Sequence, residues 1–330
     1  MNRYVFFALA ALALAATALG EGYSYKYSGS FGSYGRGEGQ FSFPSGVAVA
    51  PNGNGHYVYV VDNGNQRIQY FTSTGSFVGA WGSWGSENGQ FKYPMSVAVS
   101  PEDYVYVADK SNHRIQYFTA GGSFLGKWGS RGSGDGQFYN PCGVSVGPEG
   151  NVNVYVSDTS NDRVQYFTAN GSFLGKWGKS GSGEGQFRDP RGVAVLPNRK
   201  VYVADMANSR IQYFAAAGSF RGKWGSLGEG EGKFNFPAGV AYAPDDWNVF
   251  VADTGNHRIP YFTANGSILG SFGSEGSGDG EFEEPLGVAV SVTGARVYVA
   301  DTGNHRIQYF DRDEVAVVPA SLGRVKALFR

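Results

Sequence analysis

The sequence predicts an all-β protein in which six four-stranded sheets close into a ring, a six-bladed β-propeller. Three observations lead to this fold class. One motif recurs six times along the chain. Its period is close to the length of a four-stranded blade. The composition combines 51 glycines, 24 phenylalanines and 21 tyrosines with only 17% charged residues, as expected for short strands joined by tight turns.

The recurring motif reads V-Y-V-x-D-x-x-N-x-R-I-Q-Y-F, with small variations, and its aspartates mark the period. Successive aspartates are 47, 49, 47, 48 and 48 residues apart. A nearly constant period indicates one structural unit repeated along a single domain. The six aspartates are Asp62, Asp109, Asp158, Asp205, Asp253 and Asp301.

Each period contains four strand signals separated by turn residues. The first strand follows a glycine-rich loop that ends in G-Q-F-x-x-P, as at residues 143–146 of the third period. The second is an alternating run such as residues 105–107, whose period of two places side chains on both faces of the blade. The third is the R-I-Q-Y-F segment, and the fourth follows a Gly-Ser turn, as at residues 124–128.

The order of the strands predicts how the ring closes. The first three strand types each occur six times and end at Phe310, whereas the first copy of the fourth type, residues 27–32, precedes the first period. We therefore expect residues 27–32 to complete the last blade, a three-plus-one closure that removes open sheet edges. One position of the fourth strand should fill the space between blades with aromatic rings. Its residues are Phe31, Trp81, Trp128, Trp177, Trp224 and Phe272.

At these residues the chain resembles the NHL-repeat family, whose repeats contain V-A-D-x-x-N-H-R-I. Residues 301–307 match this motif closely, and the resemblance covers about residues 23–310. It implies a propeller domain over residues 21–312. The peptidyl-hydroxyglycine amidating lyases are similar to this fold, and they carry zinc-binding histidines near the start of the inner strands. The comparable positions, just after the loop proline, contain no histidine in this chain. They are Ser45, Met95, Cys142, Arg191, Ala238 and Leu286.

The two ends of the chain have different expected roles. Residues 1–20 combine Arg3, an apolar run over residues 5–14 and small residues near Ala18, which is typical of a secretory signal peptide. An uncleaved signal anchor has the same pattern. No later stretch is long and apolar enough to span a membrane, so we expect a secreted or extracellular protein, periplasmic or at the cell surface in a prokaryote. Residues 313–330 are predicted to form a tail, in which residues 315–318 could add an edge strand.

The charge and cysteine counts narrow the range of partners. Lys plus Arg (27) nearly balances Asp plus Glu (28), so no overall basic field attracts nucleic acid. Together with export, this argues against the RNA-binding role of NHL domains in tripartite-motif proteins. Cys142 is the only cysteine, which excludes an internal disulfide and any multi-cysteine metal site.

The polar residues of the motif have a structural interpretation. Asp, Asn and Arg recur in all six periods, so we expect Asx-type hydrogen bonds in the turn after the second strand and local pairing of Arg to Asp or to carbonyl groups. His113, His257 and His305 share one repeat position and suggest zinc, but separate blades should keep them apart. We therefore predict no metal and no cofactor.

The six positions after the loop proline differ among blades while their surroundings repeat. We expect them to line an axial channel, where Arg191 beside Cys142 and Ser45 would give a mildly electropositive wall. A small anion or carboxylate is one ligand that this wall could hold, and a channel filled by side chains and water is the other interpretation. Asn170 and Asn265 begin N-G-S sequons and are candidate glycosylation sites.

The sequence favours a secreted, non-enzymatic propeller that binds protein or glycan partners or assembles with copies of itself at a surface. Recognition would use loops on a rigid ring, with the unequal segments 51–57 and 244–247 as candidates. The alternative is a metal-dependent lyase or hydrolase, of the amidating-lyase type, that works in the axial channel.

Overall fold

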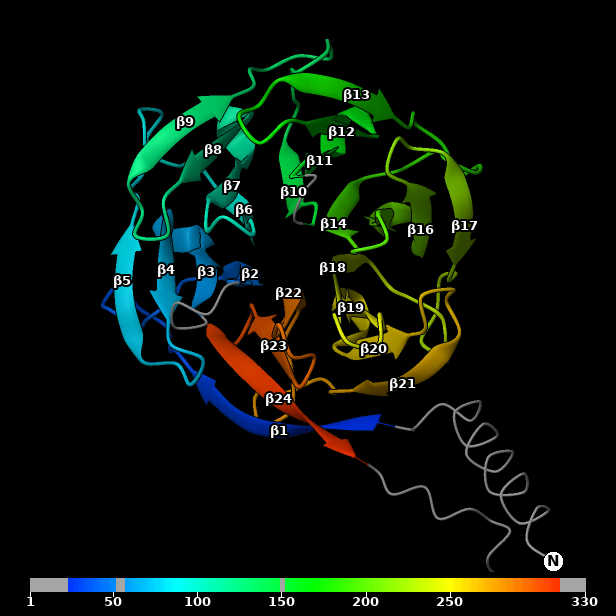
Figure 1. Cartoon of the computed structure of the whole chain (residues 1–330). Coiled ribbons are helices and arrows are strands. Elements are labelled where there is room, and N and C mark those ends of the chain that lie inside the picture. Colours follow the sequence, from blue (N-terminus) through cyan, green and yellow to red (C-terminus); the bar gives the residue numbers. More distant parts are fainter. Residues whose placement is uncertain (1–22, 52–56, 149–151, 315–330) are drawn as a thin grey trace, which may run out of the picture.

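The computed structural model describes residues 23–51, 57–148 and 152–314. It confirms the predicted fold class: six four-stranded antiparallel sheets surround a central axis as the blades of a propeller (Figure 1). The predicted signal peptide, most of the predicted tail and most of loop 51–57 lie outside the described residues.

The first five blades each take their strands in chain order, from the axis to the rim. Blade 1 contains β2 (Pro44–Val49), β3 (Val58–Asp62), β4 (Arg67–Phe71) and β5 (Phe77–Trp81), and blade 2 contains β6 (Pro94–Val99), β7 (Val105–Asp109), β8 (Arg114–Phe118) and β9 (Phe124–Trp128). Blade 3 contains β10 (Pro141–Val146), β11 (Val154–Asp158), β12 (Arg163–Phe167) and β13 (Phe173–Trp177), and blade 4 contains β14 (Pro190–Val195), β15 (Lys200–Asp205), β16 (Arg210–Ala215) and β17 (Phe220–Trp224). Blade 5 contains β18 (Pro237–Tyr242), β19 (Val249–Asp253), β20 (Ile259–Phe262) and β21 (Ile268–Phe272).

Blade 6 confirms the three-plus-one closure and corrects its bounds. It contains β22 (Pro285–Val290), β23 (Arg296–Asp301) and β24 (Arg306–Glu314), and β1 (Tyr23–Phe31) is its outer strand. Pairing runs from Tyr23 opposite Glu314 to Phe31 opposite Ile307. The closing strand therefore begins four residues before Tyr27, and the third strand continues past Phe310, because β1 and β24 extend each other by pairing from Tyr23 to Phe31.

The blades pack face to face, and the predicted aromatic position lies in these contacts. Between blades 1 and 2, for example, Ile68 and Phe118 belong to one buried cluster, and the ring of Trp81 packs against that cluster. The ring centroids of Trp81 and Phe118 are 5.6 Å apart. Gly122 lies against the Trp81 indole with a φ of +86°, and a Cβ there would lie 2.5 Å from the indole, so only glycine fits this turn.

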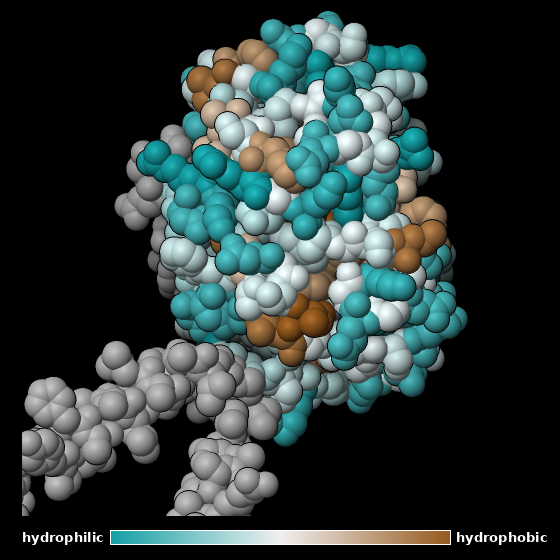
Figure 2. Space-filling view, turned by 90° about the vertical axis from the view of Figure 1, so that its right-hand side faces the viewer, coloured by the Kyte–Doolittle hydropathy of each residue, from teal (hydrophilic) through white to brown (hydrophobic). Residues whose placement is uncertain are grey.

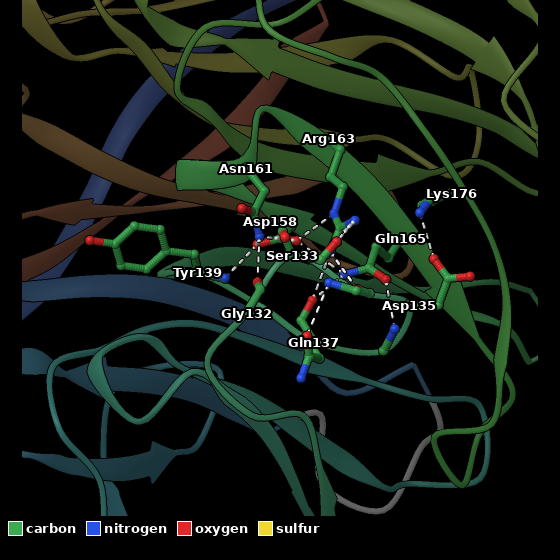
Figure 3. Close-up of polar contacts among 12 residues, drawn as sticks. Gly132, Ser133, Asp135, Gln137, Tyr139, Asp158, Asn161, Arg163, Gln165 and Lys176 are labelled. Atoms are coloured by element: carbon green, nitrogen blue, oxygen red, sulfur yellow. Dashed lines mark hydrogen bonds and ion pairs between the residues drawn. The ribbon is translucent and has the colours of Figure 1, made fainter.

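A buried carboxylate anchors each connecting loop to its blade. In blade 3, Asp158 accepts hydrogen bonds from Arg163 Nε at 2.7 Å, from Gln165 Nε2 at 3.1 Å and from the backbone N–H of Tyr139 at 2.7 Å (Figure 3). The Asn161 side chain bridges both Asp158 oxygens to the carbonyl of Gly132.

The predicted pairing of Arg to Asp and to carbonyl groups is therefore confirmed. The predicted Asx-type bonds within the turn are wrong. The 3₁₀ turn η3 (Thr159–Asn161) has no side-chain cap bond, because Asp158 accepts its backbone hydrogen bond from the preceding loop instead. The equivalent turns are η1 (Asn63–Asn65), η2 (Lys110–Asn112), η4 (Met206–Asn208) and η5 (Thr254–Asn256).

The ring has two different faces. The face that we call the loop face carries the 3₁₀ turns and the six connections from an outer strand to the next inner strand. The opposite face, the hairpin face, carries the turns from first to second and from third to fourth strands. At the rim near β17 and β21, hydrophilic residues cover most of the surface and hydrophobic residues form separate patches (Figure 2).

Candidate binding face and axial channel

The six connections on the loop face are built alike, and each is twelve residues long. In the first of them the third residue, Tyr34, pairs with the tenth, Phe41, in a short parallel bridge. Phe41 is fully buried beneath the loop, whereas Tyr34 is 70% exposed. Backbone hydrogen bonds from Gly35 to Phe41 and from Phe41 to Ser33 fix this arrangement. The third residue of each loop is thus presented to solvent from a rigid backbone.

The twelfth residue of each loop is held in a left-handed conformation. The φ angles of Phe43, Tyr93 and Phe236 lie between 50° and 52°. A bulky L-residue in this region costs about 1–2 kcal/mol, a cost that glycine avoids. These three rings are nevertheless about half exposed. The preference of the backbone for glycine does not explain why aromatic residues occupy these positions. Residues held in strained backbone conformations often lie at functional sites.

A side chain of the preceding blade explains why the backbone turns at this position. The N–H of Tyr93 donates to Gln66, and the N–H of Asn140 donates to His113 Nδ1 at 3.1 Å. The N–H of Phe43 likewise donates to His305 Nδ1 at 3.1 Å. Burial lowers the pKa of His113 and of His305, which favours the neutral imidazole that can accept these bonds.

Exposed aromatic side chains gather on three consecutive loops, and we call this set the aromatic arc. The Trp84 and Tyr93 rings meet edge to face at 5.6 Å. The rings of Tyr34 and Phe43 lie 4.9 and 4.6 Å from the His305 ring. The third loop presents Tyr139, with the Arg131 guanidinium 5.1 Å from its ring. The arc consists of Tyr34, Phe43, Trp84, Tyr93 and Tyr139, all between 38% and 70% exposed.

An acidic loop lies beside the arc. Residues 273–284 lead into blade 6, next to the loop that carries Tyr34, and this segment contains five acidic and no basic residues. Equivalent loops combine acidic and basic residues, as in segment 129–140 with Arg131 and Asp135. The loop face therefore has an aromatic sector and an acidic sector, although the blades beneath them are nearly identical.

The inner strands of the six blades surround an axial channel of about 260 Å³. The structure places all six variable positions after the loop proline, Ser45, Met95, Cys142, Arg191, Ala238 and Leu286, on the channel wall.

Arg191 and Ser45 are not neighbours in this wall, which corrects the sequence expectation. Blade 4 faces blade 1 across the ring, and Arg191 has Cys142 and Ala238 on the adjacent blades. Ser45 Oγ instead donates to the Met95 carbonyl oxygen at 3.0 Å.

The histidines lie in separate turns, as expected, and the structure adds that each is bonded to the next loop. His257 Nδ1 accepts a hydrogen bond from the Glu284 N–H at 3.2 Å. His113 and His305 accept the equivalent bonds from their own neighbouring loops. Among the described residues, no three His, Cys, Asp or Glu side chains are grouped as metal ligands.

The other predicted sites lie on the hairpin face. Asn170 and Asn265 are exposed in turns between third and fourth strands. Trp247 in segment 244–247 is 40% exposed. Residues 52–56 of segment 51–57 lie outside the described residues.

The sequence interpretation treated the glycine-rich loops only as connections that lead into the first strand of each blade, and it missed the aromatic arc. The sequence does contain a signal for the arc, because the residue types at the third and twelfth loop positions differ among the repeats. The third positions are Tyr34, Trp84, Arg131, Ser180, Leu227 and Glu275, and the twelfth are Phe43, Tyr93, Asn140, Asp189, Phe236 and Glu284.

The fold and these two surfaces define a six-bladed β-propeller whose repeated framework carries unequal loops. The family model of the NHL repeat matches residues 91–118, 187–214, 234–259 and 282–310. Four matched repeats in a six-bladed ring place the chain in the NHL-repeat propeller family. No curated protein matches it in sequence. Within the described part of the chain, no helix has the length and apolar character needed to cross a membrane.

Solved structures similar to this one share the fold. A protein of unknown function from Bacteroides thetaiotaomicron has a TM-score of 0.63 at 18% identity, over 88% of this chain and 76% of its own. A gluconolactonase from Xanthomonas campestris has a TM-score of 0.62 at 14% identity, over 84% and 88%. A streptogramin B lyase has a TM-score of 0.58 at 12% identity, over 88% and 98%.

Proposed function

We propose that this protein is an exported, non-enzymatic binding module that holds protein or glycan partners on its aromatic arc. The observation that carries the proposal is the exposure of large rings on three consecutive loops, two of them, Phe43 and Tyr93, at strained backbone positions. Exposed aromatic clusters are unusual on monomeric proteins and are typical of interaction sites.

The rigidity of the loops supports this role. Buried aspartates fix each loop to its blade, and side chains such as Gln66 fix its last residue to the neighbouring blade. Rings that are already in place lose little conformational freedom when they bind, which favours affinity. The similar lyase and gluconolactonase structures share the fold, and a fold alone does not carry a reaction.

The test compares two double variants on an array of polysaccharides and protein-linked glycans, with sedimentation to detect self-association. Trp84→Ala/Tyr93→Ala should weaken binding about 30-fold or more, because truncation of a central aromatic residue costs about 2 kcal/mol or more. Tyr104→Ala/Trp247→Ala removes rings that are 39% and 40% exposed on the hairpin face and should leave binding unchanged.

Both variants should melt within a few degrees of the wild-type protein, since surface substitutions change stability by about 0.5 kcal/mol or less. Full binding by the Trp84/Tyr93 variant, or loss of binding only in the hairpin-face variant, would refute the assignment of the arc.

A further inference from the structure

The axial channel contains one charge that the fold does not explain. Among the described residues of its wall, Arg191 is the only charged side chain, and most of the others are glycine, alanine and valine. No acidic residue in the described part of the chain shares this wall. The side chain thus sets a single positive charge in a narrow and mainly apolar passage.

The Arg191 guanidinium has no partner within the described chain. Its Nε is buried and makes no hydrogen bond. The motif arginines provide the contrast: Arg163, for example, donates to Asp158 and to three backbone carbonyl oxygens. The side chain as a whole is partly exposed and lines the channel. A buried N–H donor without an acceptor is costly, so an unpaired Nε is unusual in a folded protein.

The backbone of Arg191 is held by Ser157, a residue type that no other blade has at this position. The Ser157 hydroxyl donates to the Arg191 carbonyl oxygen at 2.5 Å and accepts from the Gly143 N–H at 2.7 Å. Thr159 Oγ1 donates to the preceding carbonyl, that of Pro190, at 2.7 Å, as the equivalent threonines do in blades 5 and 6. The position of Ser157 is occupied by alanine in four other blades and by valine in the first. These residues are Ala108, Ala204, Ala252, Ala300 and Val61.

We propose that Arg191 is the anchor of a small-oxyanion site in the axial channel, for a carboxylate or a phosphate. The planar guanidinium presents paired N–H donors that match two oxygens of such an anion. A cavity of about 260 Å³ holds a molecule of the size of acetate up to a single sugar acid, and no polymer. The apolar wall accommodates the carbon body of a carboxylate. This site lies along the axis, and the proposal does not depend on the aromatic arc.

Titration calorimetry tests the site directly, with sodium acetate, sodium glucuronate and inorganic phosphate injected separately at constant ionic strength in HEPES buffer. At least one anion should bind the wild-type protein with saturation at one site per chain. Arg191→Met, which keeps the length of the side chain, should weaken binding about tenfold or more, and Arg191→Lys should be intermediate because it keeps only the charge. Arg221→Met, which removes an exposed arginine at the rim, should bind like the wild type.

The three titrations separate the sources of the oxyanion. Stronger binding of acetate or glucuronate assigns a carboxylate, and stronger binding of phosphate assigns a phosphate. Absence of saturable binding for all three anions would overturn the proposal, as would an affinity that Arg191→Met leaves unchanged.

Melting temperatures distinguish a variant that has lost the anion site from a variant that folds poorly. The bound anion should raise the melting temperature of the wild-type protein as its concentration rises, and it should not raise that of Arg191→Met. Without the anion, Arg191→Met should melt no lower than the wild type, because it removes an unpaired guanidinium. A lower melting temperature of this variant, together with no effect of the anion on the wild type, would assign Arg191 to structure alone.

Discussion

At the residue scale, the hydrogen bonds of the six motif aspartates explain why this residue repeats in every blade. Asp158 is fully buried, and its carboxylate accepts hydrogen bonds from three side chains and one backbone N–H. Two of these donors, Arg163 and Gln165, also bond to loop carbonyl groups. The carboxylate thus joins strand, turn and loop, and its removal would leave several buried donors unpaired.

Asp158→Ala should therefore lower the free energy of unfolding by about 3–5 kcal/mol, the usual cost of breaking a buried ion pair from one side. Asp135→Ala in the same blade is the matched control. It removes an exposed pair with Lys176 and should cost less than about 1 kcal/mol. Chemical denaturation of both variants measures the difference, and equal losses would contradict the structural role of Asp158.

The histidine contacts between blades predict a dependence of stability on pH. His113 and His305 accept backbone hydrogen bonds through Nδ1, and burial lowers their pKa in the folded state. The unfolded chain then binds more protons than the folded chain near and below about pH 6.5, so stability should fall as the pH falls through this range.

His113→Gln/His305→Gln should flatten this dependence, because glutamine occupies the same position in blade 1 and accepts the same bond through Gln66. Unfolding free energies at about pH 5.5 and pH 8 provide the measurement. An unchanged slope in the double variant would show that other groups cause the dependence.

At the scale of the element, β1 differs from the other outer strands because it joins the two ends of the chain. Its Tyr25 enters the cluster between blades 5 and 6, with its ring edge to face with Phe250 at 5.2 Å and with Tyr261 at 5.4 Å. The Tyr261 hydroxyl also donates to the Tyr23 carbonyl oxygen at 2.6 Å. The strand is therefore held by packing as well as by its pairing with β24.

Tyr25→Ala should cost about 3–5 kcal/mol, the usual loss when a buried aromatic ring is truncated. Tyr25→Phe keeps the ring and removes a buried hydroxyl that has no hydrogen-bond partner among the described residues, so it should be neutral or stabilising. Thermal and chemical unfolding distinguish the two variants. A large loss in Tyr25→Phe would mean that the hydroxyl, rather than the ring, holds the strand.

At the scale of the whole molecule, a hydrophobic cluster lies between each pair of adjacent blades. The outer strands expose Lys127, Lys176 and Lys223 along the rim, where charge discourages edge-to-edge pairing with another sheet. The rim also exposes separate aliphatic side chains, such as Leu125, Leu174 and Leu269, whereas the loop face leaves large aromatic rings uncovered. This difference between surfaces favours recognition across the face of the ring.

The repeat alone was sufficient to predict the number of blades, the strand order and the closure by the N-terminal strand. A closed ring of equal units leaves few arrangements open once the motif is counted. The same regularity correctly assigned the motif Asp and Arg to structure. The repeat predicted the bounds of the first and last strands less well. Strand β1 begins before Tyr27 and β24 continues to Glu314, because pairing between these two strands extends both.

The sequence by itself determined the framework of this protein, since identical residues at identical positions dictate identical local packing in every blade. Only the tertiary structure decided which of the variable residues face solvent together. Trp84 and Tyr93 are nine positions apart, and they meet because a parallel bridge and a left-handed turn bring their loop back on itself. Arg191 is likewise an ordinary residue in the sequence, and only the structure shows that it lines the channel with no hydrogen-bond partner for its Nε among the described residues.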